Sequence, residues 1–411
     1  MNIKKTWIGL LLVLGLRFGQ YYYQLPERVG GEVVTIRGVL GSEPAQANGR
    51  QTLSLDGLYV SVRTPPEFHY GDEVMVEGKL LCYDTFRCIR GRIERARVSL
   101  VAQDQGGLLG RWGYLARMKF QDVYFGSLKR EEANLLSGVL VGSIGLDRTF
   151  KEKLANVGLT HVVAASGMNL TLFVGFLIGF FKYFHWSRPL SAVFSIGAVV
   201  LYAIIAGFAP AIVRAGLMVG GVLIGLSLGR KGGGWWGLVM AGYLMLWVDP
   251  RLIVDFSFLL SFASMMGQIV LSTWKIHLPN VFKWLAENIL QSVMAIVFTL
   301  PIIIIGFARF SLISMISNLL VLWTIEPLMI LGGLAGIVGL VLPELAKLIL
   351  IPAGVLLDYF LSVVKILGTG ENFLLRVSGF NGLMAVGYYL ILAGVYYYLM
   401  YYKTPKHTNK V

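Results

Sequence analysis

Long apolar runs between residues 158 and 402 constrain this chain more than any other feature of its sequence. A helix needs roughly 20 consecutive apolar residues to cross a bilayer. The runs therefore predict membrane spans at 158–181, 189–207, 211–229, 234–248, 252–274, 288–308, 312–341, 345–367 and 380–402. A separate run lies at 6–23. Only 14% of the 411 residues are charged, which excludes an ordinary soluble globular protein.

The net charge of +13 follows mostly from membrane orientation, because Lys and Arg in short loops stay on the cytoplasmic side. If the N-terminus is inside, twelve basic residues of alternate loops and of the tail share that side. They are Lys4, Lys5, Lys182, Arg188, Arg230, Lys231, Lys275, Lys283, Lys347, Lys403, Lys406 and Lys410. The sequence thus predicts a multi-pass protein of the plasma (inner) membrane. Both termini are expected to be cytoplasmic, and residues 24–157 are expected outside.

Five segments follow from this topology. They are an N-terminal membrane anchor helix at 1–24, an extracytoplasmic domain at 25–102, an amphipathic interfacial linker at 103–157, a multi-span domain at 158–402 and a cytoplasmic basic tail at 403–411. The first segment begins like a signal peptide, but no small-residue cleavage site follows its apolar core. We therefore expect an uncleaved anchor.

Residues 29–102 have a different pattern, with short alternating stretches such as VVTIRGVL and DEVMVEGKLL. Such alternation predicts strands, and Asn-Gly, Pro-Pro and Gly-Asp turn signals separate them. About five strands in this length indicate a small all-β barrel of the OB type. The expected fold class is thus an α-helical polytopic membrane protein with an OB-like extracytoplasmic domain.

The only two cysteines of the chain, Cys82 and Cys88, lie in this domain. Outside the membrane a nearby pair tends to form a disulfide, although two free thiols in a hairpin are the alternative. Five arginines lie in or after this loop: Arg87, Arg90, Arg92, Arg95 and Arg97. Arginines near aromatic residues suit a single-stranded nucleic acid. A solvated arginine face explains them equally well.

The linker at 103–157 mixes Leu, Trp, Tyr and Phe with Arg and Lys, as an interfacial amphipathic helix does. The sequence EEANLLSGVLVGS then predicts a second short helix at the surface.

Polar side chains inside membrane spans are costly and usually face the interior of the helix bundle. Ser257, Ser261, Ser264 and Gln268 have helical spacing and share one face, either for packing or for lining a wet cavity. Arg214 lies roughly one turn inside its predicted span, and a charge at that depth requires an anion or a carboxylate such as Asp249 or Asp255. The other candidates are His161, Ser166, Asn169, Arg251, Arg309, Ser314, Ser317 and Asn318.

Several chemistries find no support. No Cys/His or His/carboxylate group has metal-ligand spacing, and no nucleotide-binding motif occurs. We therefore expect neither a metal nor a cofactor, and no enzyme activity. An intramembrane hydrolase acting through Ser166 and His161 is an alternative, but AASGM lacks the first glycine of a nucleophile elbow. Small residues at Gly216-x3-Gly220, Gly221-x3-Gly225 and Gly332-x3-Gly336 predict close helix packing.

Four segments in order resemble the ComEC family, the DNA-uptake channel of bacterial competence. They are GLTHVVAASGMNL, YAIIAGFAPAIVRAGLM, DPRLIVDFSFLLSFAS and TLPIIIIGFARFSLISMISNLL. The resemblance carries over to His161, Ser166, Gly167, Pro210, Arg214, Asp249, Pro250, Ser261, Phe262, Pro301, Phe307 and Asn318. Two departures matter. Asn169 stands where relatives often have a second histidine, and the metallo-β-lactamase-like domain of many members is not found here.

The resemblance implies passage of single-stranded DNA inward across the membrane during natural transformation. The expected DNA path comprises His161, Ser166, Asn169, Arg214, Arg251, Ser257, Ser261, Ser264, Gln268, Arg309 and Asn318. The expected partners are single-stranded DNA, membrane lipid, an extracytoplasmic DNA receptor, a separate nuclease, a cytoplasmic helicase and a second copy of the chain. The alternatives are a small-molecule or lipid-precursor transporter, the hydrolase, and a scaffold for an uptake complex.

Overall fold

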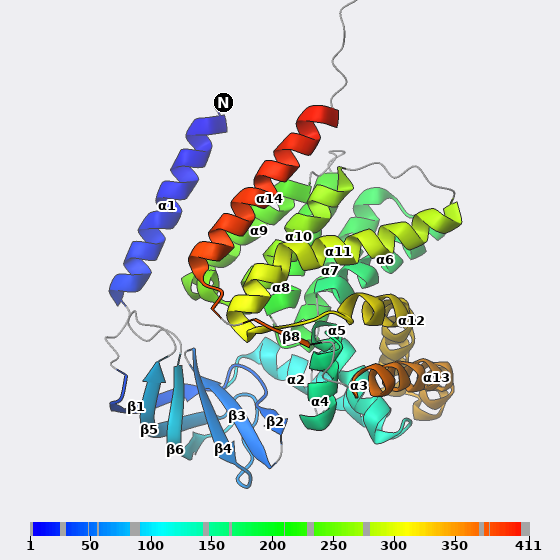
Figure 1. Cartoon of the computed structure of the whole chain (residues 1–411). Helices are drawn as coiled ribbons and strands as arrows, with labels where there is room; N and C mark the ends of the chain where they lie inside the picture. The colour runs from blue at the N-terminus through cyan, green and yellow to red at the C-terminus, as the bar shows by residue number, and fades with distance from the viewer. Residues whose placement is uncertain are drawn as a thin grey trace, which may run out of the picture.

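The computed structural model describes residues 3–24, 30–47, 49–55, 57–82, 91–142, 148–163, 167–208, 210–227, 234–273, 280–369, 374–377 and 379–403. A small N-terminal sheet lies at one end of a larger helical body (Figure 1). The first helix begins and the last helix ends at the opposite end. The predicted class is therefore confirmed in its coarse form, as a mostly helical chain with a small sheet.

The sheet contains six strands among the described residues, one more than expected. They are β1 (Val33–Val39), β2 (Ala45–Ala47), β3 (Arg50–Leu55), β4 (Leu58–Arg63), β5 (Glu73–Cys82) and β6 (Gly91–Ala102). Their order is β1-β5-β6-β4-β3-β2. Only the β4–β6 pair is parallel within this part of the chain. No pairing joins β1 to β2 there, so the predicted closed barrel stays a prediction.

Alternation along the strands builds the core of this domain. Buried and exposed residues alternate along β3 and β5, because successive side chains point to opposite faces of a strand. The inward residues form one apolar cluster that includes Leu53, Val60, Val76 and Ile93. The other face carries polar and basic side chains.

The helical body closely follows the apolar runs of the sequence. Its helices are α1 (Ile3–Gln24), α2 (Leu108–Phe125), α3 (Arg130–Val141), α4 (Arg148–Asn156), α5 (Thr160–Val163), α6 (Gly167–Tyr183), α7 (Arg188–Ile205), α8 (Pro210–Ser227), α9 (Gly234–Val248), η1 (Pro250–Val254), α10 (Phe256–Ser272), α11 (Asn280–Phe307), α12 (Ser314–Gly339), α13 (Pro343–Leu367) and α14 (Gly382–Lys403). A short ribbon of β7 (Arg309–Ser311) and β8 (Leu374–Arg376) joins the end of α11 to the approach of α14.

Four helical segments among the described residues are long and apolar enough to cross a membrane. They are Arg188–Ile205, Ile289–Phe307, Ser314–Gly339 and Pro343–Leu367. Shorter apolar helices occur at Phe173–Tyr183, Ala211–Ile224, Gly234–Val248, Phe256–Ser272 and Gly382–Tyr398. This content supports a membrane protein.

Two predicted spans can be compared with the helices of the structure. The run 158–181 was expected to be one span. α5 ends at Val163 and α6 begins at Gly167, and residues 164–166 lie outside the described residues. The run 312–341 was also expected to be a span, and most of it forms the single helix α12 with Pro327 inside it.

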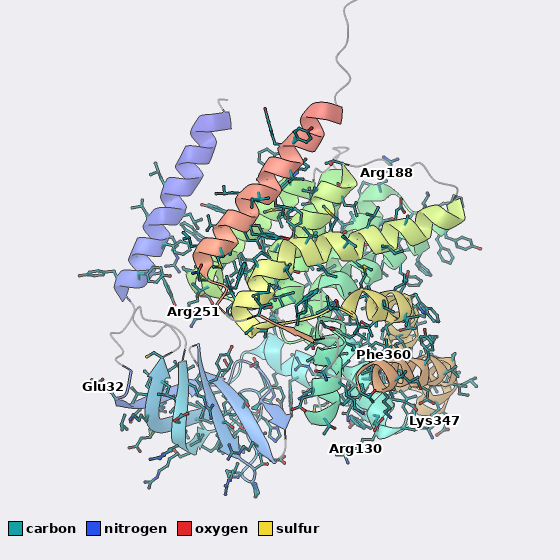
Figure 2. All side chains as sticks on the ribbon, viewed as in Figure 1. Glu32, Arg130, Arg188, Arg251, Lys347 and Phe360 are labelled. Atoms are coloured by element: carbon teal, nitrogen blue, oxygen red, sulfur yellow. The ribbon has the colours of Figure 1, made fainter. Side chains whose placement is uncertain are left out.

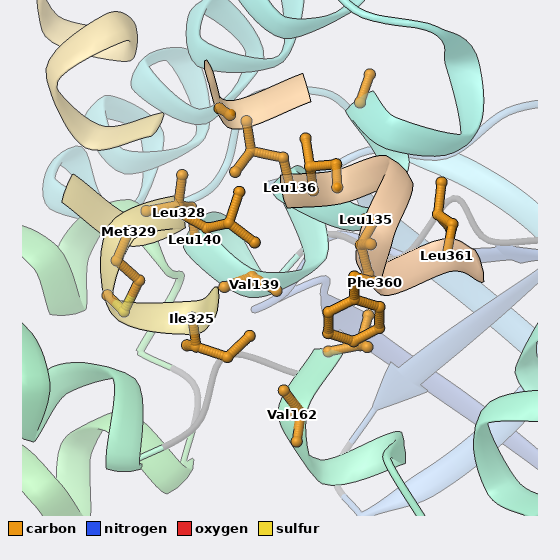
Figure 3. Close-up of a cluster of buried hydrophobic side chains, with 14 of the residues drawn as sticks. Leu135, Leu136, Val139, Leu140, Val162, Ile325, Leu328, Met329, Phe360 and Leu361 are labelled. Atoms are coloured by element: carbon orange, nitrogen blue, oxygen red, sulfur yellow. The ribbon is translucent and has the colours of Figure 1, made fainter. Parts of the chain in front are cut away.

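The largest apolar core joins the linker helices to α12 and α13. Leu135, Leu136 and Val139 of α3 lie against Leu328 of α12 and Phe360 of α13 (Figure 3). Every residue from Leu135 to Val141 in α3 is buried. The expectation that this helix lies at the surface was therefore wrong. Its apolar residues surround it on several sides, which is typical of a buried helix.

Close packing at glycine explains one of the predicted small-residue faces. A Cβ at Gly336 would lie 2.7 Å from the ring of Phe120, and a Cβ at Gly332 would overlap Leu140. The predicted close-packing face at Gly332-x3-Gly336 is thus confirmed. On α8 the outcome is mixed. A Cβ at Gly216 would lie 3.1 Å from Val199, whereas nothing lies within 4 Å of a Cβ at Gly220 or Gly221. The surroundings of Gly225 lie outside the described part of the chain.

The basic loop residues do not all lie at one end of the molecule. Arg188 lies at the end where α1 begins, whereas Lys347 lies on the side of the sheet (Figure 2). Orientation of the helices in a membrane stays a prediction.

Candidate functional site

The polar stripe of α10, which we define as Ser257, Ser261, Ser264 and Gln268, lies on one helical face. Ser257 is exposed and the other three residues are half-buried. The Gln268 amide donates to the carbonyl of Gln291 in α11 at 2.9 Å. One end of the stripe is thus used in helix packing. At the other end, Ser257 meets a charge from a different helix.

That charge is Arg214 of α8, whose side chain is only 1% exposed. Its Nη2 lies 3.4 Å from the Ser257 hydroxyl, and its guanidinium carbon lies 6.0 Å from the ring centre of Phe258. Among the described residues, Nε and Nη1 of Arg214 have no hydrogen-bond partner. A buried guanidinium with two free donors attracts an anion. The structure therefore brings two predicted site residues, Arg214 and Ser257, together.

The acidic residues beside this region are engaged by the protein itself. The Asp249 carboxylate accepts hydrogen bonds from the backbone N–H of Arg251 at 3.0 Å and from its Nε at 2.9 Å. Asp255 caps α10 by accepting from the N–H of Phe258 at 2.9 Å. Asp255 also acts electrostatically on Arg214. The carboxylate of Asp249, offered above as a partner for Arg214, is therefore paired with Arg251, its neighbour in the chain.

Serines before and within the first turn of α12 hold the segment that precedes α6. The Ser311 hydroxyl donates to the Asn156 carbonyl, and the Ser317 hydroxyl donates to the Val157 carbonyl at 2.6 Å. Gly158 has a φ of 74°, and a Cβ there would lie 2.5 Å from Cβ of Ser314. This close approach requires glycine. It fixes where the chain enters α5.

The remaining predicted residues of this region are only partly placed. His161 in α5 is exposed, whereas Asn318 in α12 is buried and its Oδ1 finds no partner within the described ranges. Ser166 lies outside the described residues. Asn169 lies in α6 and Arg309 begins β7, but their side chains lie outside the described part.

Helix neighbours connect these places into one region. α6 packs against both α12 and α8, and α8 packs against α10. Asn318 and Arg214 therefore lie on helices that share α6 as a neighbour. The arginines of the sheet belong to a separate part of the molecule.

The outward face of the sheet is basic. Arg92, Arg95 and Arg97 are exposed on β6, whereas Arg87 and Arg90 lie outside the described residues. Arg92 lies beside Tyr59 in the β4–β6 register, and Arg97 lies opposite Glu77.

Sequence reasoning missed a further pair on this face, because Arg50 and Arg63 are 13 residues apart in the chain. They lie directly opposite each other on β3 and β4, and both are exposed. The alternation of the two strands could have revealed their common face. Like charges placed directly opposite each other destabilise a strand pair, and a bound anion would relieve their repulsion.

The structure describes only one of the two cysteines that were predicted to pair. Cys82 ends β5 and is not a free thiol. Cys88 lies outside the described residues, so the pairing stays a prediction.

Ion pairs outside the apolar helices shift a few pKa values. A hydrogen bond from Arg37, 2.8 Å away, lowers the pKa of Glu73 in the sheet. Hydrogen bonds to Asp358 and Glu132 raise the pKa of Lys129 and tie the start of α3 to α13. Burial lowers the pKa of Arg117, whose Nε donates to the last carbonyl of α7, Ile205, at 3.0 Å. These pairs fasten elements together and form no reactive centre.

No group of three or more His, Cys, Asp or Glu side chains with metal-binding geometry occurs in the described ranges. The arrangement offers free donors from Arg214 and a row of hydroxyls. Such groups bind anions and water.

The fold and these polar groups define a helical membrane protein with an appended sheet. A family model for the competence protein matches residues 140–401, and the chain belongs to that family. The chain is also 25% identical over 181 residues to the ComE operon protein 3 of Bacillus subtilis (strain 168), a match that covers 44% of this chain and 23% of that protein. The chain thus matches about a quarter of that relative's length. No solved structure matches the chain.

Proposed function

We propose that this protein is a channel that moves single-stranded DNA inward across the plasma membrane during natural transformation. The contact between the buried Arg214 and Ser257 carries the proposal. It places an unsatisfied positive charge at the start of a row of hydroxyl and amide groups in a member of the competence family.

The path would follow the polar stripe of α10 and continue past neighbouring helices. A phosphodiester strand needs cations for its phosphates and water for its sugars. Arg214, Arg251 and Arg309 would meet phosphates, and the hydroxyl and amide groups would keep the path hydrated. The further members are His161, Ser166, Asn169 and Asn318. A polyanion avoids acidic walls, and the engagement of Asp249 by Arg251 supports such a path.

The extracytoplasmic sheet, which we propose is OB-like, would receive the strand. Arg87, Arg90, Arg92, Arg95 and Arg97 would contact phosphates, and a Cys82–Cys88 disulfide would hold their loop. The position of Tyr59 beside Arg92 supports this role, because bases stack on aromatic rings. Arg50 and Arg63 extend the same face.

Such a channel requires other proteins. No nucleotide-binding motif occurs in the sequence, so a cytoplasmic helicase would drive transport. A separate nuclease would degrade the second strand, and an extracytoplasmic receptor would deliver DNA. The protein would be multi-pass, with both termini cytoplasmic and the sheet outside.

The test is uptake of labelled DNA by cells whose gene for this chain has been deleted and then restored. We expect uptake to disappear on deletion and to return with the wild-type gene. Unchanged transformation in the deletion strain refutes the proposal.

For the sheet, charge reversal of Arg92, Arg95 and Arg97 should weaken binding of single strands by the full-length protein. It should also reduce the salt slope by up to about 2, since each lost phosphate contact contributes roughly 0.7. The matched control is Arg37→Glu, because Arg37 is an arginine on the same sheet that is paired with Glu73. Equal effects of control and test variants would contradict the assignment of the β6 arginines.

A further inference from the structure

α11 changes direction along its length (Figure 1). A proline inside a helix bends it, and Pro301 of α11 also leaves a gap in the helical hydrogen bonding. Proline has no N–H, so the carbonyl four residues earlier, that of Val297, has no helical donor. In an apolar environment an unsatisfied carbonyl is costly.

Two tyrosines of α14 supply the donors at this turn. The Tyr388 hydroxyl donates to the Val297 carbonyl at 3.0 Å, and the Tyr389 hydroxyl donates to the Phe298 carbonyl at 2.7 Å. The first of these is the carbonyl that Pro301 leaves free. The second already has the N–H of Ile302 within its own helix, so it gains an additional donor at the bend.

The ends of the two helices are held next to each other. β7 follows α11 and pairs with β8, which precedes α14. The N–H of Val377 also donates to the Ala308 carbonyl at 3.1 Å. This ribbon fixes the approach of α14 and thereby places the two tyrosines next to the proline turn.

Most of the remaining surface of α14 is open. Leu383, Leu390 and Ile391 are exposed, and α14 packs mainly against α11, with Leu392 and Tyr396 against the α10–α11 core. The two hydroxyl contacts therefore contribute much of the specific attachment between α14 and the bend.

We propose that Tyr388 and Tyr389 form a latch that fixes the bend of α11 at Pro301. The part of α11 before the bend carries the Gln291 carbonyl that holds Gln268 of the polar stripe. Releasing the latch lets this part swing and changes the stripe. α14 thereby sets the geometry of the stripe from outside it. The effect on DNA passage rests on the proposed function, whereas the latch itself does not.

A double-mutant cycle in the full-length protein tests the latch. Tyr388→Phe should lower the thermal midpoint in detergent by on the order of 2 °C. In a Pro301→Ala background the new N–H of residue 301 satisfies the Val297 carbonyl, and the effect of Tyr388→Phe should largely vanish. Tyr389→Phe should cost the same in both backgrounds. Tyr396 lies on the same helix, and its hydroxyl has no hydrogen bond to the part of the chain that the structure describes, so Tyr396→Phe should not shift the thermal midpoint.

Uptake of labelled DNA gives the functional readout. We expect Tyr388→Phe to lower the uptake of labelled DNA about fivefold, and we expect the added Pro301→Ala to restore it. Equal losses from Tyr388→Phe in both backgrounds, or equal effects of Tyr388→Phe and Tyr396→Phe, overturn the latch. If Pro301→Ala does not fold, the difference between the effects of Tyr388→Phe and Tyr396→Phe on the thermal midpoint still tests the latch. If the wild type takes up no DNA, the proposed function fails and the midpoints still test the latch.

Discussion

Replacing Gly158 with alanine tests how the segment carrying His161 is held. Gly158 has a φ of 74°, and an added Cβ lies 2.5 Å from Cβ of Ser314. A left-handed conformation costs a non-glycine residue about 1–2 kcal/mol, and overpacking a filled site costs about 1–3 kcal/mol. The sum predicts a loss of about 2–5 kcal/mol in the free energy of unfolding.

The matched control is Gly379→Ala. Gly379 has a φ of 85°, but nothing lies within 4 Å of its added Cβ, so only the strain of about 1–2 kcal/mol applies. The assay is unfolding of the purified full-length protein in mixed micelles during titration with SDS, followed by tryptophan fluorescence. Equal losses in the two variants would refute the contact with Ser314.

Three further predictions follow from individual contacts. Arg214→Gln should leave the free energy of unfolding unchanged or raise it, since a buried charge with two free donors is removed. Uptake of labelled DNA should fall about tenfold in this variant. A parallel fall in stability would contradict this prediction. Leu136→Ala should cost about 2–5 kcal/mol in SDS unfolding because Leu136 is fully buried, and the same loss from the exposed Leu348→Ala would refute it. Because Arg37 lowers the pKa of Glu73, their pair stabilises the sheet above the ordinary pKa of Glu73 and loses this effect as pH falls through the lowered value. Arg37→Gln should remove that small acid-side loss in a pH series of thermal midpoints, and an unchanged pH series would contradict the assignment.

The sequence predicted where the helices lie along the chain better than it predicted which residues they pack against. Apolar runs located α7 and α9 to within a few residues, because the length of an apolar run gives the length of the helix directly. They did not reveal that α3 is buried, since its partners lie far away in the chain: Leu328 of α12 is 192 residues after Leu136, and Phe360 of α13 is 225 residues after Leu135.

The candidate site was also predicted only in part: the sequence indicated its residues but not the contacts between them. Helical spacing placed Ser257, Ser261, Ser264 and Gln268 on one face, and the charge of Arg214 indicated a need for partners. Periodicity within one helix could not show that Arg214 reaches Ser257. It also could not show that Arg50 and Arg63 lie opposite each other, because strand register depends on pairing.

The most direct test of the account asks whether DNA in transit touches the polar stripe of α10. A photo-crosslinking amino acid at Ser261 or Ser264 is compared with one at Met266, which is exposed on another side of the same helix. The account predicts that labelled DNA is captured during uptake at Ser261 and Ser264 and not at Met266. Normal uptake without capture at the two serines, or with equal capture at Met266, would contradict the proposed path.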